Sequence, residues 1–394
     1  MPRSKPAKPY RDFPLFPHGS GQWAKKIRGK TWYFGSWDDP DTALKQFLAE
    51  RDHIQAGENP RLLTGSSTPG GHTVRDVCNH FLTVQRQKVD SGELSPRTFA
   101  DYMKTCERVI GFFGKETVAA TLKPSNFSAF RQSFPSTWGP RMAGREIRQT
   151  KTLFRFAAEE ELVDHLPNFG GNFKQPGVKV LRRLRQEKRN AHGELMFEAA
   201  ELRSMVAQAR RPWDAMILLG ANCAFGNSDI ANLPRNVIDL AGGWIDYGRQ
   251  KTGIDRRCPL WPETIAALRD SLLHRRLPVD SGDSELVFLT TYRNRYIRET
   301  SPGKFSDGIS GAFSKMLERW GVKRPGLGFY SLRRTFETVA AETGDQITVD
   351  HIMGHIDQSM AGVYRQRIAD AQLLRVSEHV RLWFNHNQEN ALAK

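Results

Sequence analysis

Apolar residues recur at helical spacing along most of the chain, whereas apolar and polar residues alternate in two short stretches. The helical spacing covers residues 74–166 and much of residues 194–384. The alternating stretches are residues 22–37 and 244–260, and each contains a glycine-bearing turn. We therefore predict a multidomain, mainly helical protein with small β elements.

Individual helices are predicted from the same spacing and from residues that suit helix ends. Ala43–Ile54 follows two aspartates and a threonine, and Ser95 with Pro96 forms a cap and a first helical position. The four helices of a predicted bundle cover residues 74–89, 95–113, 124–134 and 142–166. Further helices are expected over residues 194–209, 213–219, 263–273, 310–320 and 370–384.

Two stretches interrupt this periodicity and predict linkers. Residues 58–73 are dense in glycine, serine and proline, and residues 173–193 are rich in lysine and arginine. The linkers divide the chain into a small sheet domain over residues 1–57, a helical domain over residues 74–172 and a third domain over residues 194–394.

Composition favours a polyanionic partner. Lys and Arg number 58 against 43 Asp and Glu, a formal net charge of +15, which indicates nucleic acid first, an anionic membrane second and mere solubility third. No apolar run approaches the roughly 20 residues that span a bilayer, and the N-terminus lacks the apolar core of a signal peptide. The four cysteines lie far apart with no CxxC pair, so neither a zinc site nor a disulfide framework is indicated. We expect a cytoplasmic protein that is associated with the nucleoid if its polyanionic partner is DNA.

Basic residues gather where DNA contacts are expected. The predicted strands of the sheet domain carry Lys25, Lys26, Arg28 and Lys30. These residues either face DNA or form a solvated strand face, and the sequence favours neither interpretation. In the bundle, Arg145, Arg148 and Lys151 are spaced three apart and stripe one helix face, with inward-facing Leu153, Phe154 and Phe156 beside them. The other candidates are Arg97, Arg141, Arg182 and Arg183.

The stretch Phe329–Tyr364 carries candidate chemistry for cutting DNA. It holds Arg333, His355 and Tyr364 among apolar residues at helical spacing. A tyrosine is a poor nucleophile at its usual pKa of about 10, so neighbouring cations and a base must favour its phenolate. An arginine binds two phosphate oxygens at once and keeps its charge, and a histidine can donate a hydrogen bond to the same oxygens.

These residues resemble the C-terminal signature of tyrosine recombinases, the phage integrase family. That family has His-x-x-Arg, then Leu-Gly-His, then the nucleophilic tyrosine nine residues later, and here Tyr330-Ser-Leu-Arg333, Met353-Gly-His355 and Tyr364 stand in the same order and spacing. Lys251, at the predicted tip of the second hairpin, matches the family's β-hairpin lysine, whose ammonium suits a general acid.

The resemblance covers nearly the whole chain and implies an architecture and a reaction. It implies an arm-binding-like sheet of three strands with a helix, a helical core-binding bundle and a mixed α+β catalytic domain. It also implies that the protein acts as a homo-tetramer on specific sites in double-stranded DNA. The DNA would be recombined or integrated through a 3′-phosphotyrosine at Tyr364, without metal or nucleotide.

Two positions depart from the family pattern. Gly226 stands where the first catalytic arginine is expected, and Tyr330 stands where the first histidine usually is. A tyrosine hydroxyl can still bind a phosphate, but loss of one transition-state contact costs about a hundredfold or more in rate. Arg249, Arg256 and Arg257 are the candidates to fill the gap.

Alternatives therefore remain open. The chain is an active recombinase, a catalytically impaired or inactive DNA-binding protein, or a type IB topoisomerase, which shares this chemistry but acts as a monomer. Arg334 beside the site is expected to hold a phosphate rather than to catalyse. His351 and His355 are four apart like a metal-binding pair, but no third ligand is evident, so no metal is predicted.

Overall fold

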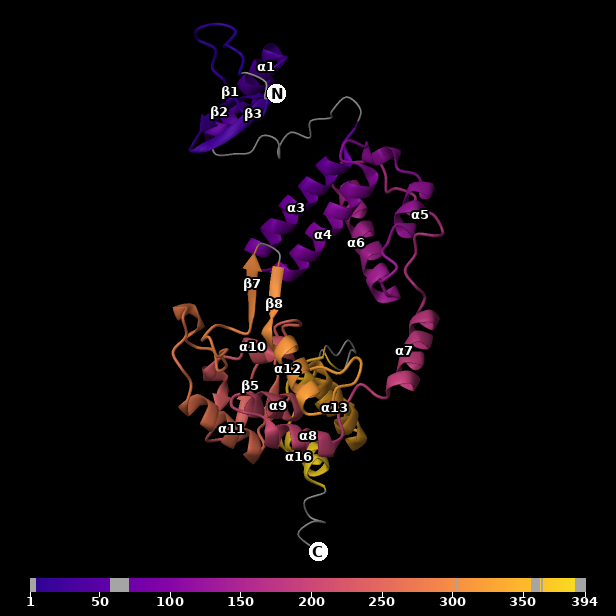
Figure 1. Ribbon diagram of the computed structural model, residues 1–394, viewed down its shortest axis with the longest axis vertical. Coiled ribbons are helices and arrows are strands. Elements are labelled where there is room, and N and C mark those ends of the chain that lie inside the picture. The colour runs from indigo at the N-terminus through magenta and orange to yellow at the C-terminus, as the bar shows by residue number, and fades with distance from the viewer. Residues whose placement is uncertain (1–4, 57–70, 302–303, 356–361, 363, 387–394) are drawn as a thin grey trace, which may run out of the picture. The chain divides into compact units, whose positions relative to one another are not determined.

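A computed structural model describes residues 5–56, 71–301, 304–355, 362 and 364–386 (Figure 1). The chain divides into two compact units, Met1–Pro176 and Gly177–Lys394, which are described separately. Both are mainly helical with small antiparallel sheets, so the predicted fold class is confirmed. Within the described ranges, none of the helices combines the length and apolar character needed to cross a bilayer.

The first unit begins with a three-stranded antiparallel sheet. Strand β1 (Phe16–His18) pairs with β2 (Gln22–Ile27), which pairs with β3 (Lys30–Ser36), and helix α1 (Pro40–Ala56) packs against β3. The predicted hairpin and helix are therefore confirmed. Their small core is aromatic and includes buried Phe13, Trp23 and Phe34.

The described part of the first unit continues with four helices, which form the predicted bundle. They are α3 (Val74–Asp90), α4 (Pro96–Phe113), α5 (Pro124–Gln132) and α6 (Pro140–Glu159), with a 3₁₀ turn at Ala119–Thr121. The Ser95 side chain accepts a hydrogen bond from the Thr98 N–H and caps α4, as predicted. Leu153, Phe154 and Phe156 are buried, as the helical spacing indicated.

The last bundle helix is shorter than predicted. It ends at Glu159 instead of residue 166, because Glu161 adopts a left-handed backbone with φ 55°. The N–H of Leu162 then turns back to the carbonyl of Ala157, which closes the helix. An apolar pattern alone does not reveal such a stop.

The second unit is built around one buried helix. Every residue of α9 (Trp213–Asn222) from Ala215 onward is buried, and α9 packs against α8 (Ala199–Gln208), α11 (Pro262–Leu273) and α13 (Tyr330–Ala340). The other helices among the described residues are α7 (Val178–His192), α10 (Asn227–Ala231), α12 (Gly308–Arg319), α14 (Gln346–Met353) and α16 (Asp370–Asn385). Short 3₁₀ turns lie at Arg235–Val237, Ser281–Asp283 and Ala341–Thr343. Helix α7 lies within the predicted basic linker and buries none of its residues.

Two small sheets complete the second unit. Strands β4 (Ile238–Asp239), β5 (Trp244–Asp246) and β6 (Arg257–Pro259) form one antiparallel sheet, and β5 with β6 is the second predicted hairpin. Strands β7 (Ile297–Ser301) and β8 (Lys304–Asp307) form a further hairpin that the sequence pattern did not predict.

Candidate active site

Arg333 is enclosed near the start of α13 and ties two loops together. Its side chain is buried, with 1% of the residue exposed. Its Nη1 donates to the carbonyl of Ala224 at 2.8 Å and its Nη2 to the carbonyl of Met353 at 2.5 Å. Arg333 therefore joins the turn before α10 to the end of α14, besides carrying the charge that the sequence predicted for this position.

His355 lies directly beside this guanidinium. Its Nε2 is 3.1 Å from Nη2 of Arg333, and its Nδ1 is 3.1 Å from a carboxylate oxygen of Asp350. Since the guanidinium can only donate, Nε2 accepts from it, and the neutral ring then carries its proton on Nδ1 toward Asp350. The structure therefore brings two of the predicted residues together, and Asp350 orients the histidine.

Gly354 lets the second hairpin approach these two residues. It caps α14 in a left-handed conformation, with φ 62°. Its carbonyl accepts from Arg249 Nη1 at 3.2 Å and from Thr252 Oγ1 at 3.1 Å. A Cβ added here would lie 2.7 Å from Cδ of Arg256 and 2.8 Å from Cβ of Arg249, so only glycine fits without displacing both arginines.

Gly354→Ala is expected to destabilise the chain by about 2–4 kcal/mol, because it adds a steric clash to a strained backbone. Gly344→Ala is the matched control: Gly344 is also left-handed, with φ 72°, but an added Cβ would meet nothing within 4 Å. Urea unfolding of both variants measures the difference. Equal losses of stability in the two variants would show that Arg249 and Arg256 move aside for a Cβ at position 354 at little energetic cost.

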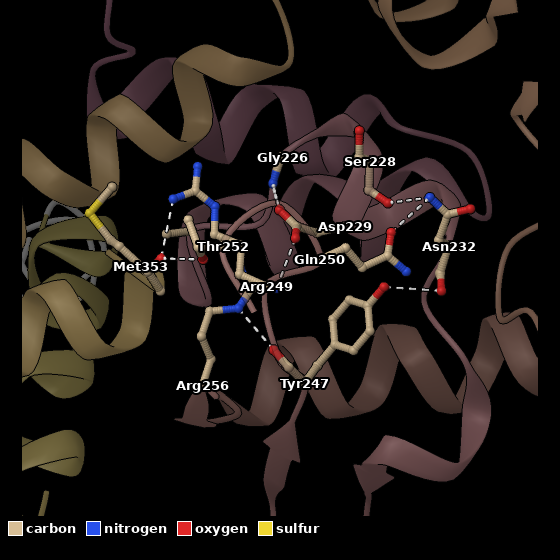
Figure 2. A network of polar contacts seen from close by, with 12 residues as sticks. Gly226, Ser228, Asp229, Asn232, Tyr247, Arg249, Gln250, Thr252, Arg256 and Met353 are labelled. Atoms are coloured by element: carbon tan, nitrogen blue, oxygen red, sulfur yellow. Dashed lines mark hydrogen bonds and ion pairs between the residues drawn. The ribbon is translucent and has the colours of Figure 1, made fainter. Parts of the chain in front are cut away.

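Arg256 is buried against a carboxylate that the sequence reasoning missed. Its Nη2 donates to Asp229 at 2.8 Å and its Nε to the carbonyl of Tyr247 at 2.8 Å (Figure 2). The other oxygen of Asp229 accepts from the N–H of Gly226 at 2.8 Å. Asp229 therefore neutralises Arg256 and fixes the start of α10. In the sequence, the only indication of this ion pair was that an aspartate stands three residues after Gly226.

The two positions that depart from the expected pattern lie next to each other. Gly226 has an extended backbone, with φ −95°, and a Cβ added there would be 3.5 Å from the ring of Tyr330 and 3.5 Å from Asp229. These are ordinary contact distances, so position 226 has room for a Cβ. Tyr330 is half exposed, and the guanidinium of Arg334 lies 5.4 Å from its ring centre.

The cluster has an excess of positive charge. Burial lowers the pKa of Arg333 to about 10, and the positive charge of Arg249 contributes to this shift. Arg333 nevertheless stays protonated near neutral pH. Within this cluster, Nε of Arg333 and Nη1 of Arg256 are buried and have no hydrogen-bond acceptor among the described residues. Buried N–H groups and unbalanced cations suit an anion such as a phosphate.

The other two predicted catalytic residues are exposed. Lys251 lies in the turn between the bridged residues Arg249 and Ile254, and Tyr364 has 75% of its surface exposed. No described contact joins either side chain to Arg333, and residues 356–361 and 363 lie outside the described residues. In the part of the chain that the structure describes, no three potential ligands are placed to hold a metal ion.

The DNA-binding candidates of the sheet are mostly solvent-accessible. Lys30 lies over the ring of Trp32, with Nζ 4.9 Å from the ring centre, and Arg28 donates to the carbonyl of Gln55 at 3.3 Å. Lys26 is exposed and Lys25 is half-buried. The sheet thus presents basic residues on accessible positions.

The bundle candidates differ among themselves. Arg97, Arg141 and Arg148 are exposed. Arg145 instead pairs with Asp101 at 3.1 Å. Lys151 lies over the ring of Phe169, and burial lowers its pKa. On α7, Arg182 and Arg183 are exposed, and Arg183 pairs with Glu187 at 3.4 Å.

Comparison with known proteins finds a family model that matches the C-terminal part of the chain and solved structures that share its fold. Residues 196–383 match the model of the phage integrase family. A lambda integrase dimer bound to a COC′ core site is 14% identical, with a TM-score of 0.53 over 90% of this chain and 94% of that chain. A lambda integrase tetramer bound to a Holliday junction is 13% identical, with a TM-score of 0.52 over 91% of this chain and 98% of that chain.

A fragment of the Tn1549 transposon integrase in complex with a circular intermediate DNA is also similar in fold. It is 15% identical, with a TM-score of 0.53 over 77% of this chain and 99% of that fragment. No curated protein sequence matches the chain. At these identities, the solved structures show a shared fold.

Proposed function

With residues 196–383 forming a phage integrase family domain, we propose that the chain is a site-specific recombinase of the tyrosine type. It cuts and rejoins double-stranded DNA through a 3′-phosphotyrosine at Tyr364. The observation that carries this proposal is the cluster of Arg333, His355 and Arg249 around the Gly354 turn, in which two guanidinium groups bind consecutive carbonyls and the buried Nε of Arg333 has no acceptor among the described residues.

The proposed step exchanges one phosphate ester for another. The hydroxyl oxygen of Tyr364 gives its proton to solvent water and attacks the phosphorus, while the bond from phosphorus to the 5′ oxygen breaks. The 5′ oxygen takes up a proton, for which Lys251 at the hairpin tip is the proposed donor. The guanidinium groups neutralise the charge that develops on the non-bridging oxygens. The reverse step rejoins the strand, and no nucleotide is consumed because the number of ester bonds does not change.

The remaining parts of the chain are proposed to hold the DNA. We assign residues 1–57 to an arm-binding-like domain, residues 74–172 to a core-binding domain and residues 194–394 to the catalytic domain. Basic residues on accessible positions of the sheet, the bundle and α7 support this assignment. A lambda integrase tetramer was solved on a Holliday junction, and a homo-tetramer on DNA is proposed here by analogy.

A recombination assay tests the proposal. DNA from the ends of the element that carries the gene supplies the candidate sites, and a plasmid with two such sites is incubated with the full chain. Joined products from the paired-site plasmid support recombination. Relaxation of a supercoiled plasmid that has no such site, without joined products, would instead indicate a topoisomerase.

A second candidate function follows from Gly226. Because no arginine stands there, a DNA-binding protein that scarcely cuts is the alternative. Site-specific binding without any covalent adduct on a nicked suicide substrate would favour this alternative over the recombinase.

Binding is expected to weaken steeply with salt, because a chain with a net charge of +15 that contacts several phosphates releases counterions. For six to ten phosphate contacts, affinity is expected to fall by about 10³- to 10⁵-fold between about 50 and 200 mM salt. Fluorescence anisotropy of a labelled duplex measures this slope. A flat salt response would contradict the assignment of the basic residues to DNA.

A further inference from the structure

The gap at Gly226 sets the requirements for a replacement cation. It must lie beside Arg333 and His355, which bind at the turn formed by residues 353–355. It must also have N–H groups left for a phosphate and no carboxylate that cancels its charge. Three arginines of the β5–β6 hairpin are candidates by sequence, and their contacts differ sharply.

Arg257 does not meet these requirements. Its Nη1 donates to Asp246 at 2.7 Å and its Nε to Asp370 at 3.0 Å. Its guanidinium also lies over the ring of Trp244, 4.2 Å from the ring centre. Successive residues of a strand point to opposite faces, so Arg257 leaves the hairpin on the other side from Arg256.

Arg256 is near the site, but its charge is already paired with a carboxylate. It is 3% exposed, its charge is balanced by Asp229, and its guanidinium packs over Phe225, 4.6 Å from the ring centre. One N–H group of Arg256 remains without an acceptor. Arg256 therefore has a structural role beside the site. Removing it would leave the Asp229 carboxylate without its partner, so a loss of activity could not be assigned to catalysis.

Arg249 meets each requirement. Its Nη1 donates to the carbonyl of Gly354, while Arg333 donates to the carbonyl of Met353 immediately before it. The two guanidiniums therefore bind consecutive carbonyls of one turn, directly before His355. In Figure 2 the guanidinium of Arg249 lies between Met353 and Gly226 in this view.

The charge of Arg249 is also available. It is partly exposed, and within the described residues it forms no ion pair with a carboxylate. One of its five N–H donors is used by Gly354, which leaves the others for phosphate oxygens. The lowered pKa of Arg333 agrees with this placement, since Arg249 is the nearby charge with the largest effect on it.

We propose that Arg249 binds the scissile phosphate in place of the arginine that position 226 lacks. The proposal rests on the recombinase function given above. In this proposal two guanidinium groups bind the phosphate, as in the family pattern, but the second comes from Arg249 in the turn between β5 and β6 instead of from position 226 at the start of α10.

Arg249→Ala is expected to slow covalent attachment to a nicked suicide duplex by about 10²- to 10³-fold, the usual effect of removing one transition-state contact. Adding Gly226→Arg to that variant is expected to recover at least about tenfold, because a guanidinium at position 226 restores a bidentate phosphate contact. A Cβ at position 226 would meet its neighbours at ordinary contact distances, and the backbone there suits any residue. Arg249→Lys keeps the charge without the planar fork and is expected to lose less than Arg249→Ala.

Arg257→Ala is the matched control, because it removes a guanidinium from the same hairpin that faces elsewhere. Its attachment rate is expected to stay within a few-fold of the unmodified chain. The Tm of every variant is measured in parallel, so that a folding defect in Arg249→Ala is recognised. If there is one, the attachment rate of the double variant with Gly226→Arg decides whether the guanidinium acts on the phosphate. Equal rates for Arg249→Ala and the unmodified chain, or no recovery in the double variant, would overturn the proposal.

A second readout separates this proposal from the recombinase function. Orthovanadate, a phosphate mimic, is titrated into the full chain and into Arg249→Ala, with binding followed by vanadium NMR. An unmodified chain that forms no adduct but binds vanadate in an Arg249-dependent manner would overturn the recombinase function and support the phosphate site. A chain that forms the adduct equally well with or without Arg249 would overturn only the role of Arg249, and failure of both readouts would overturn both proposals.

Discussion

Tyr364→Phe is expected to abolish covalent attachment of the chain to DNA while leaving its affinity for DNA nearly unchanged. The change removes one hydroxyl group from a side chain that is 75% exposed, so neither packing nor stability should suffer. Without the hydroxyl oxygen, no ester to phosphorus can form. A denaturing gel of the chain after incubation with a radiolabelled suicide duplex measures attachment, and anisotropy measures binding.

Tyr292→Phe provides the matched control for this experiment. Tyr292 lies in the same unit and is 81% exposed, so the same hydroxyl group is removed from an equally accessible tyrosine. Its adduct yield should equal that of the unmodified chain. An adduct that persists in Tyr364→Phe would assign the nucleophile to another residue and contradict the proposed mechanism.

Arg333→Ala is expected to lower both stability and covalent attachment strongly. The guanidinium is buried and donates to the carbonyls of Ala224 and Met353, so its removal leaves two acceptors without donors. Each unsatisfied buried group costs about 1–3 kcal/mol, which gives a total of about 2–6 kcal/mol and a Tm lower by several degrees. Loss of a phosphate contact adds a further loss of cleavage rate, of about 10²-fold or more.

Arg334→Ala, one residue later on α13, separates the structural part of this effect. Arg334 is partly buried over the ring of Tyr330, and its side chain donates to no loop carbonyl of the described residues. Its removal should leave the Tm within about 1 °C, since substitutions away from such features change stability by less than about 0.5 kcal/mol. Calorimetry of both variants checks the contrast. Similar Tm values for Arg333→Ala and Arg334→Ala would contradict the role of Arg333 in joining the two loops.

Most of the architecture was predictable from the sequence because its signals are local. Helix α4 begins where Ser95 and Pro96 place it, and the β5–β6 hairpin follows from alternating residues around a glycine-bearing turn. The β7–β8 hairpin was missed because Arg298, Glu299 and Thr300 interrupt any apolar alternation. Its strands are paired by backbone hydrogen bonds, which leave little trace in side-chain pattern.

The candidate site was predictable only in part, because its contacts join distant segments. Arg333 and His355 were identified by their spacing, and the structure places them 3.1 Å apart. The contact of Arg249 with Gly354 spans 105 residues, and that of Arg333 with Ala224 spans 109. Such pairings depend on how α13, α14 and the hairpin pack, so the sequence named Arg249 as one candidate of three without ranking it.

The identity of the residue bound to DNA tests the central claim most directly. The adduct formed by the unmodified chain on a suicide duplex is digested with protease and nuclease, and mass spectrometry locates the nucleotide that remains. We predict a 3′-linked nucleotide on Tyr364. A nucleotide on any other residue, or a 5′ linkage, would contradict the proposed reaction.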